Sequence, residues 1–307
     1  MGAPWPEYSV PGCGVRLHAV VAGPEDGPPV VLLHGFPEFW YGWRHQIGPL
    51  AAAGFRVVAL DQRGYGRSDK PTAVKDYALD LLAADVVAVL DHMAIPRAAV
   101  VGHDWGGIVG WWLAMTRPDR VSGLAVANAP HPAVMRAKVE GSVSQLLKSW
   151  YVFAAQIPRL PEALGGWRDF GFLIRSLTRS ARPGTFTPAD LAAYRAAWAA
   201  PGELTGMVKW YRAAFRHRPA PPAGGGRVTV PALILWGNRD RFLDRDLADL
   251  SASFCADARV VRFPAATHWL FHEEPDRANA ILLNFLRAPT PRGHTHDPAL
   301  PPVVNAA

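Results

Sequence analysis

Apolar residues along the chain follow two patterns, which predict two kinds of secondary structure. Seven short segments have the composition of strands: residues 15–21, 30–33, 55–60, 98–101, 121–127, 230–236 and 259–263. The first alternates apolar and polar positions, as a half-buried strand does. Most of the others are continuous apolar runs, which are typical of strands buried on both faces of a parallel sheet.

Between these strands, apolar residues recur every three or four positions, as on one face of a helix. One such helix follows Asp76, which we expect to cap it, and carries apolar residues at positions 79, 82, 86, 89 and 93. A last helix is expected to open in the acidic stretch from Glu273 to Asp276. A further helix start is predicted at Thr187, an N-cap residue followed by Pro188 and, at the third position, Asp190.

The alternation of strands and helices is interrupted once, between residues 131 and 222, where the spacing is helical throughout. Strands that alternate with helices predict a mostly parallel sheet covered by helices on both faces. The helical block is then an insertion above the carboxyl ends of the strands, where such sheets bind ligands. The predicted organisation is an α/β core over 1–130 and 223–287, an all-helical cap over 131–222 and a loose tail over 288–307.

Composition narrows the class of protein. The chain has 307 residues, 50% of them hydrophobic, which suits a globular protein with a large core. No apolar run approaches the roughly 20 residues of a membrane span, and the N-terminus lacks a signal-peptide pattern. Cys13 and Cys255 form no metal-ligand pattern. We therefore expect a cytoplasmic protein with no membrane span, metal or cofactor.

The charge distribution bears on possible nucleic-acid binding. The net charge is +6, and the excess lies in residues 131–220, where 13 Lys and Arg stand against 5 Asp and Glu. No cluster of basic residues or nucleic-acid motif accompanies this excess. The pattern therefore favours a solvated basic face and no nucleic-acid partner.

Residues 99–110 contain the first candidate for chemistry, Asp104, at a turn between an apolar run and an apolar helix. Gly102 and Gly106 lie two positions before and after it, so the stretch has the form of the nucleophile elbow Gly-x-Ser-x-Gly with Asp in place of Ser. Glycines permit the sharp turn, and the following helix N-terminus directs free N–H groups toward developing negative charge. The alternative is that Asp104 only caps the helix.

Five motifs occur along the chain in a recognisable order: His34-Gly-Phe-Pro-Glu-Phe-Trp40, Asp61-Gln-Arg-Gly-Tyr-Gly-Arg-Ser-Asp-Lys-Pro71, Gly102-His-Asp-Trp-Gly-Gly107, Leu235-Trp-Gly-Asn-Arg-Asp240 and Thr267-His-Trp269. With them the chain resembles the α/β-hydrolases, and among these the epoxide hydrolases that carry a helical cap. The resemblance extends over nearly all of residues 8–286. It implies the α/β-hydrolase fold, a small-molecule epoxide and water as reactants, and no cofactor.

The chemistry of an aspartate nucleophile requires further residues. A carboxylate that attacks carbon forms an ester, and a base must activate water to hydrolyse it. His268 is the candidate base, and Asp240 is the candidate acid that orients its ring, with Asp244 and Asp246 as nearby competitors. Some relatives place this acid after the strand that here ends at Asn128, where no carboxylate stands, and this favours Asp240.

The resemblance also implies an oxyanion site. The backbone N–H groups of Phe36 and Trp105 are expected to bind the oxyanion of the ester's tetrahedral intermediate. Trp105 directly follows the candidate nucleophile, and Phe36 lies in the His-Gly-x-Pro turn. The alternative is that residues 34–37 form only a tight turn.

Two tyrosines of the cap are the candidate acids. Tyr151 and Tyr211 stand in stretches that resemble the family's two cap motifs, and a tyrosine hydroxyl stays protonated at neutral pH. The resemblance implies that both donate hydrogen bonds to the epoxide oxygen. The alternative is that each ring only packs its helix onto the core. Tyr194 is a third cap tyrosine outside either motif.

Two other functions share parts of this pattern. A haloalkane or haloacid dehalogenase of the same fold also uses an Asp nucleophile with a neighbouring Trp. Many such enzymes carry Asn where Phe36 stands here, and they lack the tyrosine pair. A non-catalytic receptor is disfavoured by the complete set of Asp104, Asp240 and His268. The natural epoxide and the choice between monomer and homodimer stay open.

Overall fold

The computed structural model describes residues 4–220 and 222–288. The predicted tail, residues 288–307, lies outside the described residues apart from Ala288. Within the described ranges, no helix is long and apolar enough to cross a membrane.

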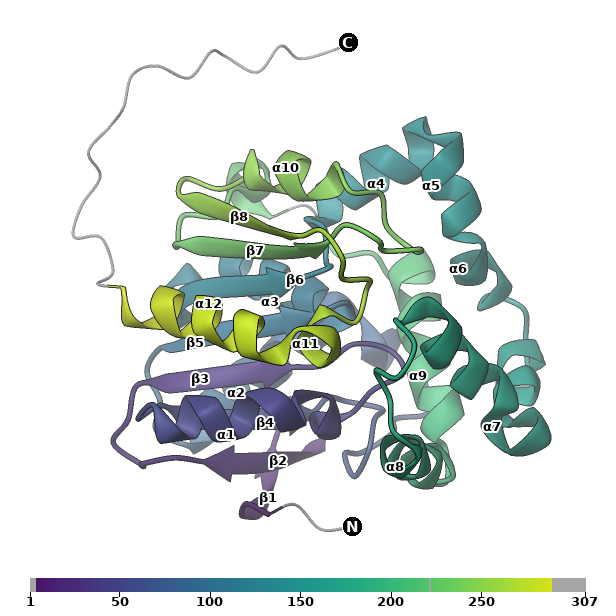
Figure 1. Cartoon of the computed structure of the whole chain (residues 1–307), viewed down its shortest axis with the longest axis horizontal. Helices are drawn as coiled ribbons and strands as arrows, with labels where there is room; N and C mark the ends of the chain where they lie inside the picture. The colour runs from purple at the N-terminus through teal and green to yellow at the C-terminus, as the bar shows by residue number, and fades with distance from the viewer. Residues whose placement is uncertain (1–3, 221, 289–307) are drawn as a thin grey trace.

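An eight-stranded sheet forms the centre of the described chain, in the order β1-β2-β4-β3-β5-β6-β7-β8 (Figure 1). The strands are β1 Glu7–Pro11, β2 Arg16–Ala22, β3 Pro29–Leu33, β4 Arg56–Asp61, β5 Ala98–His103, β6 Val121–Ala127, β7 Ala232–Gly237 and β8 Ala258–Phe263. The strands β3 to β8 are mutually parallel, whereas β1 and β2 pair antiparallel to their neighbours. The predicted mostly parallel sheet is confirmed.

The continuous apolar runs of the sequence form the interior of this sheet. Every residue of β5 and β7 is buried, as expected for strands covered on both faces. All of the predicted strands are present, but the pattern missed β1. This strand lies at the edge of the sheet, and Val10 is its single buried residue, so it has almost no apolar signal.

Helices cover both faces of the sheet. One face packs against α2 Leu79–His92, α3 Trp105–Thr116 and α10 Leu247–Ala252, and the other against α1 Arg44–Ala52, α11 Leu270–Glu273 and α12 Pro275–Arg287 (Figure 1). Short 3₁₀ turns occur at η1 Trp40–Trp43, η2 Val74–Tyr77, η3 Pro118–Arg120 and η4 Ala223–Gly226. This arrangement confirms the α/β-hydrolase fold class.

The helical block between β6 and β7 lies at one end of the sheet, beyond the carboxyl ends of the parallel strands (Figure 1). It consists of α4 Pro132–Gly141, α5 Val143–Lys148, α6 Trp150–Ala154, α7 Leu160–Ser180, α8 Pro188–Trp198 and α9 Glu203–Arg216. The backbone of α7 leaves helical geometry from Trp167 to Phe170. We call this block, α4 to α9, the cap.

One of the predicted helix starts needs correction, and two are confirmed. Asp76 lies in η2 and does not cap α2, which begins after Ala78 without a side-chain cap. The last helix starts at Pro275, inside the predicted acidic stretch from Glu273 to Asp276, with Glu274 at its N-cap. At α8, Thr187 and Asp190 form the predicted capping box.

Candidate active site

Asp104 occupies the turn between β5 and α3 with a positive φ of 50° and a ψ of −119°. It stands at the N-cap position, but its side chain makes no capping hydrogen bond, so the capping alternative is wrong. Its Oδ1 instead accepts a hydrogen bond from the Phe36 N–H at 2.9 Å. The carboxylate therefore points away from its own helix, toward the loop that follows β3.

Glycines allow these two loops to approach each other. A Cβ atom on Gly35 would lie 2.4 Å from the Cβ of Asp104, and one on Gly106 would lie 2.0 Å from the carbonyl oxygen of Leu33. Both distances are far inside van der Waals contact. These positions require glycine because the elbow crosses the end of β3, not only because the turn is sharp.

His268 bridges two carboxylates. Its Nδ1 lies 2.7 Å from Asp240 Oδ2, and its Nε2 lies 3.6 Å from Asp104 Oδ2. Asp240 is further held by the backbone N–H groups of Phe242 and Leu243, which donate to Oδ1 at 2.7 and 3.1 Å. The imidazole is therefore fixed in orientation between the end of β5 and the loop after β7.

Asn128 also binds Asp240 Oδ2, the oxygen that contacts His268. Its amide donates to Asp240 Oδ2 at 2.6 Å, and its own oxygen accepts from the Gly237 N–H at 3.0 Å. The competitors lie elsewhere: Asp244 pairs with Lys148 at 2.7 Å, and Asp246 pairs with Lys138 at 2.5 Å. The structure thus brings Asp240, and neither competitor, to His268.

The two carboxylates determine the charge of the imidazole. Burial acts to lower the pKa of His268, but Asp240 and Asp104 together raise it to about 10. Burial likewise acts to raise the pKa of Asp104, and the hydrogen bond and charge of His268 hold it below its usual value. At neutral pH the resting site is therefore an imidazolium between two carboxylates.

The cap places two tyrosines near this centre. The rings of Tyr151, on α6, and Tyr211, on α9, meet edge to face with centroids 5.8 Å apart. Burial, followed by the charge of Asp104, raises the pKa of both hydroxyls above the usual tyrosine value. Both groups are therefore protonated donors over the whole physiological pH range.

Phe36 and Trp105 line the space beneath Tyr211. Their rings contact the Tyr211 ring edge to face, with centroids 5.3 and 5.1 Å from its centroid. Trp105 is the first residue of α3, where backbone N–H groups lack helical acceptors, and the Phe36 N–H already points at Asp104. The two amides expected to form the oxyanion site thus flank the carboxylate.

A buried polar cluster behind the site was not predicted from the sequence. Glu38 accepts a hydrogen bond from the Tyr194 hydroxyl at 2.5 Å, lies 2.9 Å from His272 Nε2, and lies 3.3 Å from His103 Nδ1. His103 Nε2 in turn lies 2.9 Å from the carbonyl oxygen of His268. Glu38 lies in the His34–Trp40 motif and His103 directly precedes Asp104, but no spacing in the sequence links them.

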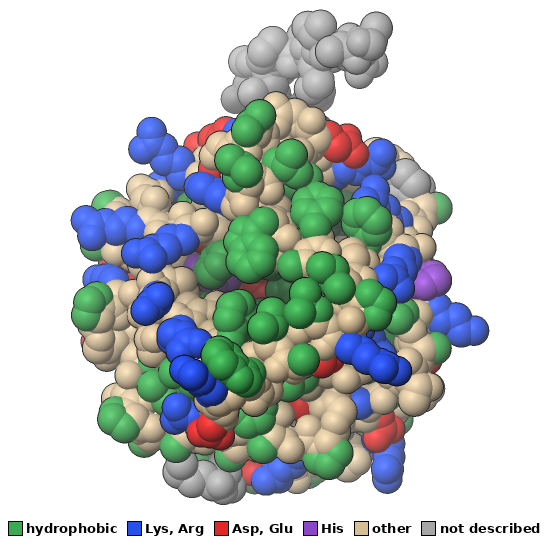
Figure 2. All heavy atoms as spheres, turned by 90° about the vertical axis from the view of Figure 1, so that its right-hand side faces the viewer, with side chains coloured by type: hydrophobic (Ala, Val, Ile, Leu, Met, Phe, Trp, Pro, Cys, Tyr) green, Lys and Arg blue, Asp and Glu red, His purple; other side chains and the backbone are tan. Residues whose placement is uncertain are grey.

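Tyr194 therefore has a different environment from the other cap tyrosines. Its hydroxyl is used by Glu38, and its ring stacks on Trp198 at 5.7 Å. The hydrogen bond from Tyr194 to Glu38 joins α8 of the cap to the loop after β3. Figure 2 views the cap end of the molecule and shows a hollow surrounded by apolar side chains, with acidic and histidine atoms visible inside it.

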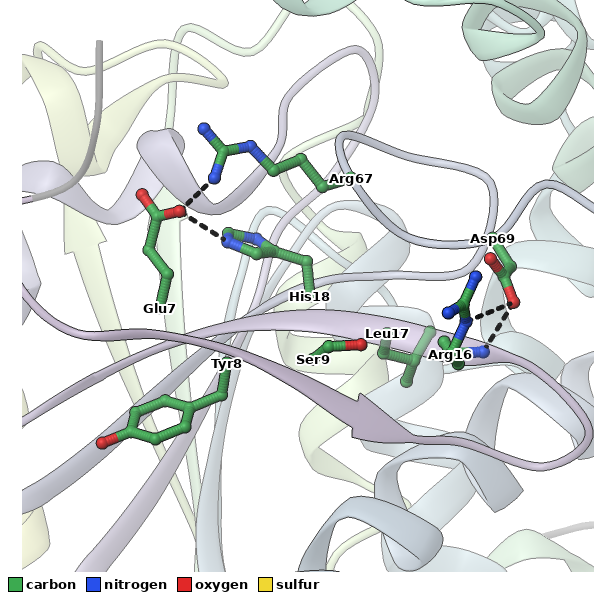
Figure 3. A pocket seen from close by; sticks show the side chains of 8 residues that line it. All are labelled: Glu7, Tyr8, Ser9, Arg16, Leu17, His18, Arg67 and Asp69. Atoms are coloured by element: carbon green, nitrogen blue, oxygen red, sulfur yellow. Dashed lines mark hydrogen bonds and ion pairs between the residues drawn. The ribbon is translucent and has the colours of Figure 1, made fainter.

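A separate shallow pocket of about 360 Å³ lies at the β1–β2 edge of the sheet (Figure 3). Its charges are paired with one another: Glu7 with Arg67 and His18, and Arg16 with Asp69. Burial acts to lower the pKa of His18, but its hydrogen bond to Asp61 raises it. We assign this pocket a structural role. Among the described residues, no group of three or more His, Cys, Asp or Glu is arranged to hold a metal ion.

Comparison with known proteins identifies the family. A family model described as alpha/beta hydrolase fold matches residues 28–275. The chain belongs to the α/β-hydrolase family. It is 43% identical to the AB hydrolase superfamily protein YfhM of Bacillus subtilis, over 89% of this chain and 95% of that one. It is also 38% identical to Epoxide hydrolase 4 of Mus musculus, over 91% of this chain and 78% of the relative.

Solved structures of epoxide hydrolases also superimpose closely on this α/β-hydrolase. An epoxide hydrolase of Bacillus megaterium in complex with an inhibitor superimposes with a TM-score of 0.83 at 29% identity, covering 92% of this chain and all of that one. Epoxide hydrolase A of Mycobacterium thermoresistibile superimposes with a TM-score of 0.75 at 32% identity, covering 92% and 98% of the two chains. The predicted membership of the epoxide hydrolase family is confirmed.

Proposed function

We propose that this α/β-hydrolase converts an epoxide and water to a vicinal diol through a covalent ester on Asp104. One observation carries the proposal: His268 lies between the elbow carboxylate and Asp240, and two cap tyrosines lie close enough for the charge of Asp104 to raise the pKa of their hydroxyls. The relatives named epoxide hydrolases support the same reaction. Asp104, His268 and Asp240 take the roles of nucleophile, base and orienting acid.

Ring opening is the first step. An Asp104 carboxylate oxygen attacks an epoxide carbon, the C–O bond of the ring breaks, and the epoxide oxygen takes a proton from Tyr151 or Tyr211. The products are an ester on Asp104 and a tyrosinate. Ester formation removes the charge of Asp104, which lowers the pKa of His268 because one of its two carboxylate partners is gone. His268 can then release its proton, which restores the tyrosine.

Ester hydrolysis is the second step. Neutral His268 takes a proton from water, the hydroxide attacks the ester carbonyl carbon, and the N–H groups of Phe36 and Trp105 bind the oxyanion. Collapse breaks the bond between the ester carbonyl carbon and the alkyl oxygen, which takes the proton of the newly added hydroxyl. The diol then leaves, Asp104 is again a carboxylate, and His268 keeps its proton as the imidazolium. The resting ion pair is therefore the state that each turnover restores, and Asp240 stabilises the imidazolium at the end of each cycle.

Single turnover in ¹⁸O-labelled water tests the covalent ester. The first diol is expected to be unlabelled, because its new oxygen comes from Asp104, and label in that diol would show direct attack by water. In His268→Gln the ester should accumulate and raise the protein mass by the mass of the epoxide. Asp104→Asn, the matched control, should show no such adduct.

A parallel assay addresses the dehalogenase alternative. A halide leaves as a stable anion and needs no proton donor, so the tyrosine pair has a use only in opening an epoxide. We expect diol from a styrene-type epoxide and no halide from haloalkanes or haloacids. Halide release without diol formation would contradict the proposed function.

A further inference from the structure

The apolar side of α5 and α6 faces outward. Val143, Leu147 and Trp150 are 74, 68 and 60% exposed, and they lie at the i, i+4 and i+7 spacing of one helix face. Such a face normally packs onto the core. In α5 the one buried residue is instead the polar Gln145, whose amide contacts the backbone at Phe242 and Asp244.

The exposed apolar surface continues beyond α6. We define the apolar cap face as the exposed large apolar residues of the cap near α5, α6 and the first half of α7, with one from α9: Val143, Leu146, Leu147, Trp150, Phe153, Ile157, Leu160, Leu164, Trp167 and Phe215. The rings of Phe153 and Phe215 contact each other at 6.3 Å, which joins α6 to α9. Figure 2 shows apolar side chains gathered across this end of the molecule. A soluble monomer rarely exposes so extended an apolar surface without a partner.

Four exposed arginines border this face, and we call them the basic rim. They are Arg159, Arg168, Arg216 and Arg218. Arg168 and Arg218 lie over the rings of Trp167 and Phe215 at 4.4 and 5.5 Å. In the part of the chain that the structure describes, none of the four pairs with a carboxylate. By contrast, Lys148 and Arg212 of the cap pair with Asp244 and Glu162.

We propose that the apolar cap face and its basic rim bind the surface of an anionic lipid bilayer. Exposed tryptophan, leucine and phenylalanine suit the headgroup boundary, and arginines beside them attract anionic lipids. A second copy of this chain fits less well. A twofold dimer through the same patch would bring the two basic rims together, and like charges at an interface oppose association.

The patch adjoins the candidate active site. The ring of Trp150 contacts that of Tyr151 at 6.5 Å, and Phe215 follows Tyr211 by one helical turn on α9. Docking by this face would turn the hollow of Figure 2 toward the bilayer. On the proposed function, from which this consequence follows, the substrates would be lipophilic epoxides that partition into membranes.

Vesicle binding by the full chain, measured without substrate, tests the proposal. We expect binding to phosphatidylcholine vesicles that contain phosphatidylglycerol, and much weaker binding to phosphatidylcholine alone or at high salt. The variant Val143→Ser/Leu147→Ser should lower the partition coefficient by about tenfold or more, because it removes apolar contact with the bilayer. Leu250→Ser is the matched control and should bind as the parent does. Leu250 is 45% exposed and lies on α10, which belongs to the α/β core and not to the cap.

The basic rim is tested separately. Arg168→Gln/Arg218→Gln should lower the partition coefficient by about tenfold or more on anionic vesicles, with little effect on neutral ones. Arg117→Gln, at an exposed arginine after α3 that pairs with Asp119, should have little effect. None of these residues belongs to the candidate active site, so turnover of a water-soluble epoxide should stay at the parental rate.

Several outcomes would overturn the proposal: no binding to any vesicle, or equal binding by the parent and the Val143→Ser/Leu147→Ser variant. A dimer in sedimentation velocity that Leu147→Ser dissociates, without vesicle binding, would identify a second copy as the occupant. If the protein binds vesicles but forms no diol, membrane binding by the apolar cap face is supported and only the proposed function is contradicted.

Discussion

The central strands of the α/β core and the outer helices of the cap, α5 and α6, differ in how completely their residues are buried. Every residue of β5 and β7 is buried, whereas the residues of α6 are at most half-buried and α5 has one buried residue, a glutamine. Burial of apolar surface fixes the core strands in a close-packed interior. The proposed nucleophile, orienting acid and base, Asp104, Asp240 and His268, all follow core strands, and the proposed proton donors, Tyr151 and Tyr211, come from the cap.

The cap is attached to the core by apolar packing, since Tyr194, Trp198 and Trp210 belong to the main buried apolar cluster, and by polar contacts with core loops. The indole N–H groups of Trp198 and Trp210 donate to the carbonyl oxygens of Pro37 and Arg63 at 2.7 and 2.9 Å. The Gly206 backbone lies so close to Gly64 that a Cβ there would be 2.3 Å from the Gly64 oxygen. These contacts hold α8 and α9 closely, while α5 and α6 rest on the core with few buried side chains. Tyr211 is thus anchored more firmly than Tyr151.

Loss of the orienting acid should give the largest effect, because it acts in the core. Asp240→Asn is expected to keep the fold and lower kcat by about 10⁴-fold, as a wrongly held tautomer does in other triads. Asp244→Asn is the control, since Asp244 pairs with Lys148 and not with His268. Near-parental turnover by Asp240→Asn, with Asp244→Asn inactive, would reassign the role.

Loss of both cap donors should cost somewhat less. Tyr151→Phe or Tyr211→Phe alone should be partly tolerated, and the double variant should lower the rate of ring opening by roughly 10²–10⁴-fold. Tyr194→Phe removes the same hydroxyl from a tyrosine bonded to Glu38 and should change ring opening far less. Pre-steady-state ester formation measures this step, and a parental rate in the double variant would exclude these donors.

A buried glutamate where the cap contacts the core should make the free energy of unfolding depend on pH. Glu203, at the start of α9, accepts from the Gly66 N–H at 2.8 Å and lies 3.2 Å from Lys70 Nζ. Burial outweighs Lys70 and raises the pKa of Glu203 to about 7 in the folded state. The folded state therefore binds this proton more tightly than the unfolded state. The resulting stability is full below about pH 4.5, the ordinary value, and is lost as the pH rises through 7.

Urea unfolding at pH 5 and pH 8 measures this contribution. The parent should lose more free energy of unfolding between the two values than Glu203→Gln does, by a difference on the order of 1–3 kcal/mol. Glu140→Gln, at an exposed glutamate of α4 paired with Arg136, should behave as the parent. An identical pH dependence in the parent and Glu203→Gln would show that Glu203 titrates normally.

The smallest effect is expected where α5 meets the core through a partly exposed ion pair. Lys148→Gln removes the contact with Asp244 and should lower stability by less than about 1 kcal/mol, with a difference that shrinks at high salt. Arg136→Gln, whose pair lies wholly within α4, is the comparison. A loss above about 2 kcal/mol would mean that α5 is held far more firmly than its burial indicates.

Local signals in the sequence determined much of this protein. Apolar runs predicted most of the strands from β3 to β8, since strands buried on both faces need apolar residues throughout, and alternation of apolar and polar residues predicted β2. The capping box at Thr187 was predictable because its partners lie within one turn. The elbow at Asp104 and the motifs around it identified the family, because tight turns and close backbone approaches admit few residue types.

Only the tertiary structure decided which distant groups meet. Asn128, Asp240 and His268 come from three loops, and nothing in their separation along the chain encodes a shared oxygen atom. The cluster of Glu38 and Tyr194 is likewise assembled by packing the cap on the core. Helical spacing at residues 143–150 shows that an apolar face exists, but its direction depends on where the helix docks. That face points outward because the polar Gln145 takes the position against the core.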